Sequence, residues 1–399
     1  MRVLMLSWEY PPHSVGGLGR HVTDLLPALD RCGVSVQVLT PRWRSGDPIE
    51  PIGQRCQVHR VDPPAEASER GDFVGCVNLT NMRLADYAGT LIRDSGPFDL
   101  IHAHDWLVTP AATALKHQQK TPLVATVHAT EWGRNRGHLT TELQFAINNV
   151  EWRLTYEAWR VVTCSNYMAR EVRQIFQTPS DKVDVIPNGV DIEHFSTLRN
   201  GSATGFGPLH AEPLGFYVGR IVPEKGIDVL LDAIATVVRQ HGPMRFVFAG
   251  TGPHLERARE HALQLGLDGN VQFAGFISDK DRDAFYREAS VAVIPSLYEP
   301  FGIVALEAMA ARVPVVASRV GGLAEVIHDE SDGLLVEPGD ATALGASIVR
   351  TLTETAETAA RVERAFELVK TEFTWDAIAQ RTRFVYDRVV DERRNSPWR

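Results

Sequence analysis

Short apolar runs rich in β-branched residues alternate along this chain with longer segments in which apolar residues recur at helical spacing. The first such unit has an apolar run at 2–6, a glycine-rich turn, and then Val22, Leu25, Leu26 and Leu29. The run predicts a buried strand, and the spaced residues predict a helix with one buried face. Strands that alternate with helices are typical of parallel α/β sheets.

The alternation continues to the end of the chain. Pro27 lies inside the first helical pattern and is expected to kink or shorten that helix, because proline lacks an N–H donor. A C-terminal helix is predicted at 375–390. Further strands are predicted at 34–39, 99–103, 123–128, 161–164, 183–186, 215–218, 245–249, 271–273, 291–295, 314–317 and 334–336.

The predicted strands fall into two series separated by a stretch rich in Gly, Ser and Pro. We expect an α/β protein with two doubly wound, Rossmann-like domains that face each other across a cleft. The expected parts are a first domain at 1–195, a linker at 196–213, a second domain at 214–374, and a C-terminal segment at 375–399 that packs back on the first domain. Ligands of such sheets bind outside the carboxyl ends of the strands.

Composition narrows the class of protein. The 399 residues are 44% hydrophobic and 23% charged, which fits a globular protein with large cores and excludes a small binding module. The net charge of −9 argues against nucleic acid or an anionic membrane as the main partner. The four cysteines form no C-x-x-C pair, and no apolar segment has the roughly 20 residues that span a bilayer, so we expect a cytoplasmic protein.

Two loops have residues suited to binding phosphate. Gly16 and Gly17 open the first helix, where free N–H groups can approach an anion, although such glycines are also common as purely structural turn residues. Arg220 and Lys225 follow the strand at 215–218, and two cations on one loop suit a diphosphate. The structural alternative for this pair is two solvated surface charges.

The segment after the strand at 291–295 has two glutamates in different settings. Glu299 is expected in a loop, and Glu307 in a helix that begins near Gly302. The first N–H groups of that helix, at Gly302, Ile303 and Val304, are free to bind a phosphate or a sugar hydroxyl. Glu299 alone is also explained as a partner of the helix dipole, whereas Glu307 lies among apolar residues and needs a partner for its charge.

These segments occur in an order that resembles a known family. The chain resembles the retaining nucleotide-sugar glycosyltransferases of family 4, which have the GT-B fold, and among them the bacterial glycogen synthase-like α-glucan glucosyltransferases. The resemblance covers nearly the full length and rests on these segments: SWEYPPHSVGGLGRHV at 7–22, HAHDW at 102–106, TVHATEWG at 126–133, CSNYM at 164–168, VIPNGVD at 185–191, VGRIVPEKG at 218–226, FAGTG at 248–252, YEPFGIVALEAMA at 298–310 and GGLAEVI at 321–327.

The resemblance implies a role for each matching residue. The roles are as follows: donor phosphates at Gly16, Gly17, Arg220 and Lys225; the donor sugar at Glu299, Phe301, Gly302, Ile303 and Val304; the nucleotide ribose at Glu307; the reacting sugar beside His128; and the acceptor near His104 and Asp105. His128, Glu299, Arg220 and Lys225 would form the catalytic centre. The structural alternative is a hydrogen-bonded histidine at a strand end for His128, and loop capping for His104 and Asp105.

Neither a metal nor a cofactor is expected, because Arg220 and Lys225 can neutralise the diphosphate. The Asp279-Lys280-Asp281 segment contains an Asp-x-Asp motif, but after Ser278 it is better explained as the first turn of a helix, where acids favour the dipole. The family is thought to react by attack of the acceptor on the same face that the leaving group departs from, so no covalent nucleophile is assigned.

The resemblance favours one function and leaves others open. The first is transfer of glucose from ADP-glucose or UDP-glucose to the non-reducing end of an α-1,4-glucan. The alternatives are glucosyl or mannosyl transfer to a small molecule, a lipid or another polysaccharide, and a GT-B-fold nucleotide-sugar epimerase, which would need no acceptor. A non-catalytic sugar-binding protein is disfavoured because the phosphate cations and both glutamates are present.

Overall fold

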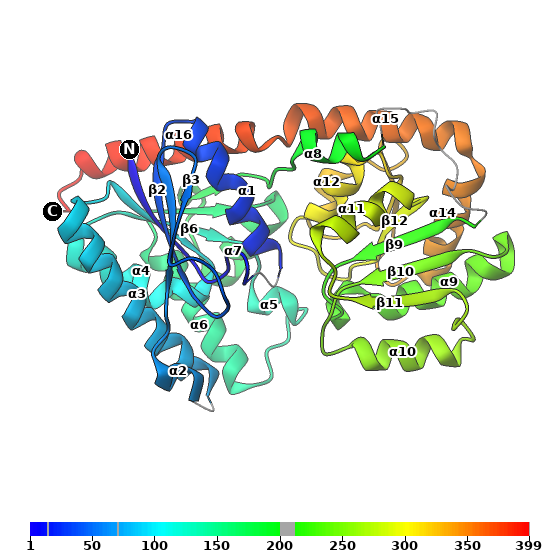
Figure 1. The fold of residues 1–399 in the computed structure, drawn as a ribbon, viewed down its shortest axis with the longest axis horizontal. Coiled ribbons are helices and arrows are strands. Elements are labelled where there is room, and N and C mark those ends of the chain that lie inside the picture. Colours follow the sequence, from blue (N-terminus) through cyan, green and yellow to red (C-terminus); the bar gives the residue numbers. More distant parts are fainter. Residues whose placement is uncertain (14–15, 70–71, 200–211, 399) are drawn as a thin grey trace. The chain divides into compact units, whose positions relative to one another are not determined.

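The apolar runs predicted as strands form two sheets in the computed structural model of this protein, which describes residues 1–13, 16–69, 72–199 and 212–398 (Figure 1). The chain divides into two compact units, one made of residues 1–189 with 375–399 and the other of residues 190–374. Most of the predicted linker, residues 196–213, lies outside the described residues, and the division between the units falls after Gly189.

The first unit is built on an eight-stranded sheet with the order β3-β4-β2-β1-β5-β6-β7-β8. Neighbouring strands are parallel except β3 and β4, and the register pairs Val3 of β1 with Val36 of β2 and with Leu100 of β5. The strands are β1 (Arg2–Ser7), β2 (Ser35–Pro41), β3 (Ile49–Ile52), β4 (Cys56–Val61), β5 (Leu100–His104), β6 (Leu123–Val127), β7 (Arg160–Thr163) and β8 (Val183–Val185).

Helices cover both faces of this sheet (Figure 1). They are α1 (Gly17–Arg31), α2 (Ala65–Glu69), α3 (Phe73–Ser95), α4 (Thr109–Gln119), α5 (Glu131–Arg134), α6 (Glu142–Glu157), α7 (Asn166–Phe176) and α16 (Trp375–Arg394), with short 3-10 turns η1 (Trp106–Val108) and η2 (Ser180–Lys182). The C-terminal helix α16 packs on α1 and belongs to the first unit, as the sequence predicted. Ile378 and Tyr386 of α16 share one core with β1 and α1.

Helix α1 is not shortened at Pro27. It continues to Arg31 because Leu25, Leu26 and Leu29 are almost completely buried around the proline. Burial of each leucine contributes roughly 1.5–3 kcal/mol, which together outweighs the ~3 kcal/mol cost of proline in a helix interior. Tertiary packing therefore overrides the local preference.

The sequence predicted no strand in the region of the β3–β4 hairpin. Ile49 pairs with His59 and Ile52 with Cys56 in antiparallel register. The residues of β3 alternate between exposed and half-buried, so this edge strand has no apolar run that would identify it. The other predicted strands are all present, with ends that differ by at most two residues.

The second unit has a six-stranded sheet with the order β11-β10-β9-β12-β13-β14, and all its paired strands are parallel. Its strands are β9 (Leu214–Val218), β10 (Arg245–Ala249), β11 (Val271–Gly275), β12 (Val291–Ile294), β13 (Val315–Ser318) and β14 (Leu334–Val336). Its helices are α8 (Ile192–Ser196), α9 (Ile227–His241), α10 (Leu255–Gln264), α11 (Asp279–Glu288), α12 (Ile303–Ala310), α13 (Leu323–Val326), α14 (Ala341–Thr353) and α15 (Thr355–Glu372), with turns η3 (Thr197–Arg199) and η4 (Pro223–Lys225).

The core of this unit lies between the sheet and its helices. Phe246 and Phe248 of β10 are almost fully buried with Leu231 and Ile234 of α9. All four cysteines of the chain are free thiols. Among the described helices, none combines the length and the apolar character that a bilayer-spanning segment requires.

Candidate functional site

Strand β9 marks a topological switch point in the second sheet. It lies between β10 and β12, so the chain leaves the ends of β9 and β12 toward opposite sides of the sheet. Ligands of open α/β sheets bind in the crevice outside such a pair of strands. Arg220 follows β9 and Glu299 follows β12, so the order of the strands places both loops at this crevice.

Lys225 and Glu299 are in direct contact. Lys225 Nζ donates to Glu299 Oε2 at 2.7 Å, and Ser296 Oγ donates to the same oxygen at 3.2 Å. The backbone fixes this pairing, because the N–H groups of Leu297 and Tyr298 donate to the carbonyl of Glu224 at 2.8 and 3.1 Å. The Lys225 and Glu299 side chains are only 20% and 14% exposed. The pair is therefore held in place from both loops.

Arg220 is more exposed than Lys225 and its contact is longer. Its Nη2 lies 3.3 Å from Glu224 Oε1, and its side chain is 43% exposed. The hydroxyl of the buried Tyr217 donates to the Arg220 carbonyl at 2.8 Å, which holds the backbone while leaving the guanidinium at the surface. A weakly held, exposed guanidinium is free to turn toward an incoming anion.

The start of helix α12 depends on two glycines. Gly302 has a φ of +108°, and a Cβ there would lie 2.5 Å from Leu323 Cδ2. Gly322 donates its N–H to the Glu299 carbonyl at 2.9 Å. Phe301 is 4% exposed, so its side chain packs inside while its backbone forms the turn. The amides of Ile303 and Val304 open the helix and have no acceptor within it.

Glu307 has the partners that its burial requires. It is 6% exposed, accepts a hydrogen bond from the Tyr286 hydroxyl at 3.0 Å, and lies 3.7 Å from Arg282 Nη1. Arg282 in turn lies over the ring of Phe195 at 5.1 Å. The two glutamates thus have different surroundings: Glu299 faces a lysine in a loop, and Glu307 is embedded in a helix.

The Asp-x-Asp segment is a helix cap. Helix α11 begins at Asp279, and the Ser278 hydroxyl accepts from the Asp281 N–H at 3.2 Å while the Asp281 carboxylate accepts from Ser278. This reciprocal pair is a capping box, which accounts for the acids in the first turn.

In the first unit, β1, β5 and β6 are neighbours and end at one edge of the sheet. His21 of α1, His104 at the end of β5 and His128 after β6 meet there, and we call these three residues the histidine cluster. His104 Nδ1 and His128 Nε2 are 3.0 Å apart, and one ring nitrogen from each member lies within 4.8 Å of the others. His21 Nδ1 also contacts Asn188 Oδ1 at 2.6 Å.

Burial keeps this cluster uncharged. Desolvation lowers the pKa of His21 to about 3 and that of His128 to about 4, and it holds the pKa of His104 well below its usual value. His102, one residue before Ala103 in β5, is also buried and is bound to the Tyr386 hydroxyl at 2.6 Å. At neutral pH these rings act as hydrogen-bonding groups without charge.

Asp105 braces the loop after β6. Its Oδ1 accepts from the His128 N–H at 2.7 Å, and its own φ is +60°. Burial raises the pKa of Asp105 to about 6. This contact is the structural role that the sequence left open for Asp105, and it also fixes where His128 lies.

Gly16 and Gly17 begin helix α1 as expected. The Gly16 N–H donates to Glu9 Oε2 at 3.0 Å, so a carboxylate already lies at this amide. A Cβ on Gly16 would meet nothing within 4 Å. The Glu9 carboxylate therefore occupies the amide that the sequence predicted for phosphate binding.

Sequence analysis assigned no role to several residues of this region. Glu151 of α6 accepts from the Glu131 N–H with both oxygens at 2.9 Å, and burial raises its pKa to about 8. His21 and His102 lie in two of the segments that carry the family resemblance. Only their positions in the fold, on helix α1 and on strand β5 beside β6, could have identified them as neighbours of His128. Nothing in the sequence near Glu151 marks it as part of this region, because the other residues of the region, such as Asp105, lie far away along the chain.

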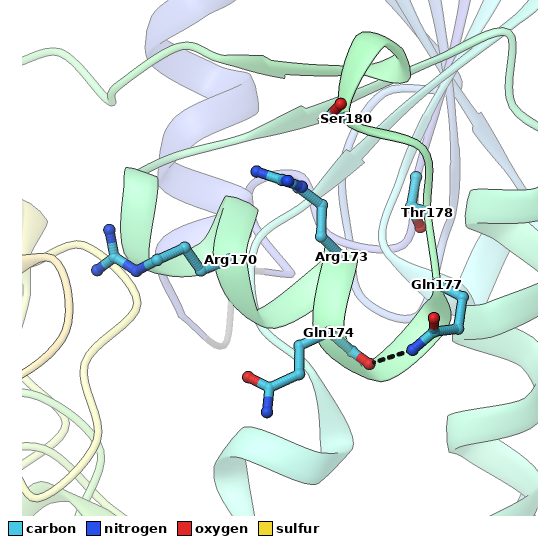
Figure 2. Close-up of a pocket in the computed structure, with 6 residues that line it drawn as sticks. All are labelled: Arg170, Arg173, Gln174, Gln177, Thr178 and Ser180. Atoms are coloured by element: carbon cyan, nitrogen blue, oxygen red, sulfur yellow. Dashed lines mark hydrogen bonds between the residues drawn. The ribbon is translucent and has the colours of Figure 1, made fainter.

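A polar pocket of about 640 Å³ lies along helix α7 (Figure 2). None of its lining residues was predicted from the sequence. They are Arg170, Arg173, Gln174, Gln177, Thr178 and Ser180. Gln177 Nε2 donates back to the Gln174 carbonyl at 2.8 Å, which closes the end of the helix.

Two units with largely parallel, doubly wound sheets, one of which has an ion pair at its strand switch point beside a helix N-terminus, fit the GT-B fold of glycosyltransferases. The sucrose-phosphate synthase structure from Thermosynechococcus elongatus has the same fold, with a TM-score of 0.83, 26% identity, and coverage of 98% of this chain and 99% of that one. This fold and the matches below define the protein as a glycosyltransferase, an enzyme that transfers a sugar.

The chain belongs to glycosyltransferase family 4. Residues 15–194 match the model described as Glycosyltransferase Family 4, and residues 207–367 match the model described as Glycosyl transferases group 1. An uncharacterized glycosyltransferase of Methanocaldococcus jannaschii is 35% identical over 97% of this chain and 98% of its own. The glycogen synthase of Mycobacterium tuberculosis is 33% identical over 97% of this chain and 94% of its own.

Proposed function

We propose that this enzyme transfers glucose, with retention of configuration, from ADP-glucose or UDP-glucose to the non-reducing end of an α-1,4-glucan. One observation carries the donor side of this proposal: the Lys225–Glu299 pair lies beside the N-terminus of α12 at the β9–β12 switch point. The similarity to a glycogen synthase over almost the whole chain supports the acceptor.

The donor diphosphate is proposed to bind Arg220 and Lys225. Breaking the sugar–phosphate bond builds negative charge on the leaving diphosphate, and fixed cations stabilise that charge. Loss of one such donor costs roughly 2–4 kcal/mol of barrier by analogy with oxyanion sites. The N–H groups of Gly16 and Gly17 are also proposed to bind donor phosphate.

The donor sugar and ribose are proposed to bind the two glutamates. Glu299 and the backbone at 301–304 are suited to sugar hydroxyls, because they offer a carboxylate acceptor beside amide donors. Glu307 is proposed to hold the ribose, and His128 to lie beside the reacting sugar. An uncharged His128 can hydrogen-bond a hydroxyl without repelling the positive charge that develops on the anomeric carbon.

The test is release of nucleoside diphosphate from ADP-, UDP- and GDP-glucose, each with and without glycogen or maltooligosaccharides, in EDTA. We expect release from ADP-glucose or UDP-glucose that glucan stimulates severalfold. Donor turnover that glucan does not stimulate would contradict the acceptor. Interconversion of nucleotide sugars without any acceptor would indicate an epimerase instead.

A second candidate is transfer to a small phosphorylated sugar. The relation to a sucrose-phosphate synthase favours it, since that protein's name includes a phosphorylated product. The same assay separates the candidates: stimulation by hexose phosphates and not by glucan would support this one. The proposed donor residues are the same in both cases.

A further inference from the structure

Helix α6 has an aromatic outer face. Phe145, Trp152 and Tyr156 follow one another at helical spacing with Asn149 between them, so all four project from one side of the helix. The three aromatic residues are 52%, 46% and 67% exposed. The Trp152 and Tyr156 rings are stacked, with centroids 5.3 Å apart and planes within 18°. We call these four residues the aromatic face of α6.

The inner side of the same helix is fixed to the segment that follows His128. Glu151 holds the Glu131 N–H with both oxygens at 2.9 Å, and Arg134 Nη2 lies 3.2 Å from Glu151 Oε1. Helix α5, which contains Glu131 and Arg134, begins directly after the loop of His128 and presents Trp132 with 40% exposure. The aromatic face therefore lies on a helix whose inner side is fixed to the segment that follows the proposed acceptor residues.

The exposed charges of α6 itself do not favour a polyanion as the ligand of this face. Among the exposed residues of α6, Glu142 and Arg153 are the charged ones, and they cancel. An anionic membrane or a nucleic acid would need several lysines or arginines here. An uncharged polyhydroxyl chain fits better: the C–H faces of its sugar rings pack on aromatic rings, and its hydroxyls hydrogen-bond to the Asn149 amide and the Tyr156 hydroxyl.

The area of the face also excludes a stable subunit interface built on it alone. With 150–250 Å² for each aromatic side chain and the exposed fractions above, the three rings offer roughly 250–410 Å². A standard interface buries about 800 Å² on each partner. A row of rings of this size is instead suited to a few sugar units of a polymer.

We propose that the aromatic face of α6 binds an uncharged polysaccharide acceptor chain, away from the end that reacts. This inference rests on the proposed function, and it specifies the acceptor as an extended chain rather than a short oligosaccharide. Binding at this face raises the local concentration of chain ends near the catalytic centre. Long acceptors therefore gain an advantage that short ones lack.

The experiment compares the wild type with a Trp152→Ala/Tyr156→Ala double variant. Phe384→Ala is the matched control, because Phe384 is an exposed aromatic residue of α16 in the same unit, with 66% exposure. We expect the KM for glycogen to rise at least tenfold in the double variant, which corresponds to about 1.4 kcal/mol of binding. The KM for maltotriose and for the donor, and both values in the control, should change less than twofold.

Retardation in native gels that contain glycogen measures binding without catalysis. The wild type and the control should be retarded, and the double variant should migrate as it does without glycogen. Equal retardation of all three, equal loss with short and long acceptors, or a change of oligomeric state without a change in retardation would each overturn the proposal. A wild type that binds glycogen but does not elongate it would contradict the proposed function and leave the binding face supported.

Discussion

Replacing Gly322 with alanine tests whether the loop that carries Glu299 is positioned by a close backbone contact. Gly322 lies in the turn before α13, and its N–H donates to the Glu299 carbonyl at 2.9 Å. A Cβ at this position would lie 2.4 Å from Phe301 Cα and 2.4 Å from the Pro300 carbonyl oxygen. The φ of Gly322 is −69°, which alanine adopts without strain, so the effect is purely steric.

The size of the effect follows from what the new methyl group meets. Its neighbours are backbone atoms, so no side chain can rotate away, and overpacking of this kind costs roughly 1–3 kcal/mol. In a unit of this size each kcal/mol lowers Tm by about 2–4 °C. The strain is relieved by movement of residues 299–301, and a displacement of ~1 Å at a catalytic group can cost about 100-fold in rate.

The assays are a thermal melt and donor kinetics on the purified variant. We expect a lower Tm for Gly322→Ala, a higher donor KM, and kcat/KM reduced roughly 10- to 100-fold. Gly269→Ala is the control, because a Cβ there would meet nothing within 4 Å and its φ is not positive. It should keep full activity and gain up to about 1 kcal/mol of stability. Wild-type donor KM and Tm in Gly322→Ala would refute this account of the loop.

Three further predictions concern charge. Lys225→Met should lower kcat roughly 100- to 1000-fold with the fold retained by circular dichroism, and wild-type turnover would exclude Lys225 from the donor site. Glu151 holds a proton in the folded state up to its pKa of about 8, whereas the unfolded chain releases it near 4.5. Stability should therefore fall as pH rises from 4.5 to 8, and urea titrations of Glu151→Gln should show a flatter slope; an unchanged slope would contradict this. Because the histidine cluster offers three uncharged nitrogen ligands, micromolar Zn²⁺ should inhibit reversibly, whereas EDTA should leave activity unchanged; loss of activity in EDTA would indicate a required metal.

The sequence predicted those parts of the fold that bury continuous apolar surface. Strands such as 245–249 and 334–336 were located to the residue, because a buried parallel strand is apolar on both faces. The edge strand β3 is exposed on one side and only half-buried on the other, and two of its four residues are Glu50 and Pro51. Its sequence therefore resembles a loop. Pro27 led to the opposite error: the sequence predicted a shortened or kinked helix, whereas α1 continues to Arg31. A rule about proline alone cannot account for the packing of its neighbours.

The candidate site was predicted less completely, because it is assembled from distant segments. Glu299 and Lys225 were both named from the sequence, but only the structure shows that one nitrogen and one oxygen meet at 2.7 Å. His104 and His128 were named separately, and their contact with His21 depends on the order of β1, β5 and β6. Residue types and strand ends can be predicted from a sequence, whereas the burial and the pKa of a side chain depend on the folded unit.

Asp105, rather than a histidine, is expected to control activity at mildly acidic pH. Histidine ordinarily titrates near 6.5, but burial lowers the pKa of His128 to about 4, so this ring stays neutral throughout the working range. Burial moves the pKa of Asp105 upward to about 6, so its carboxylate takes up a proton as the pH falls through that value. Protonation weakens acceptance of the His128 N–H and releases His128, the residue proposed to lie beside the reacting sugar.

The pH dependence of kcat/KM separates these two groups. We expect the wild type to lose activity below about pH 6 and Asp105→Asn, whose amide oxygen still accepts the His128 N–H, to show no inflection there. A matched His128→Asn variant should have a lower kcat/KM at every pH and keep the inflection, because Asp105 accepts from the backbone N–H of residue 128. If the inflection disappears in His128→Asn and persists in Asp105→Asn, the histidine is the titrating group, and burial does not keep it neutral as argued.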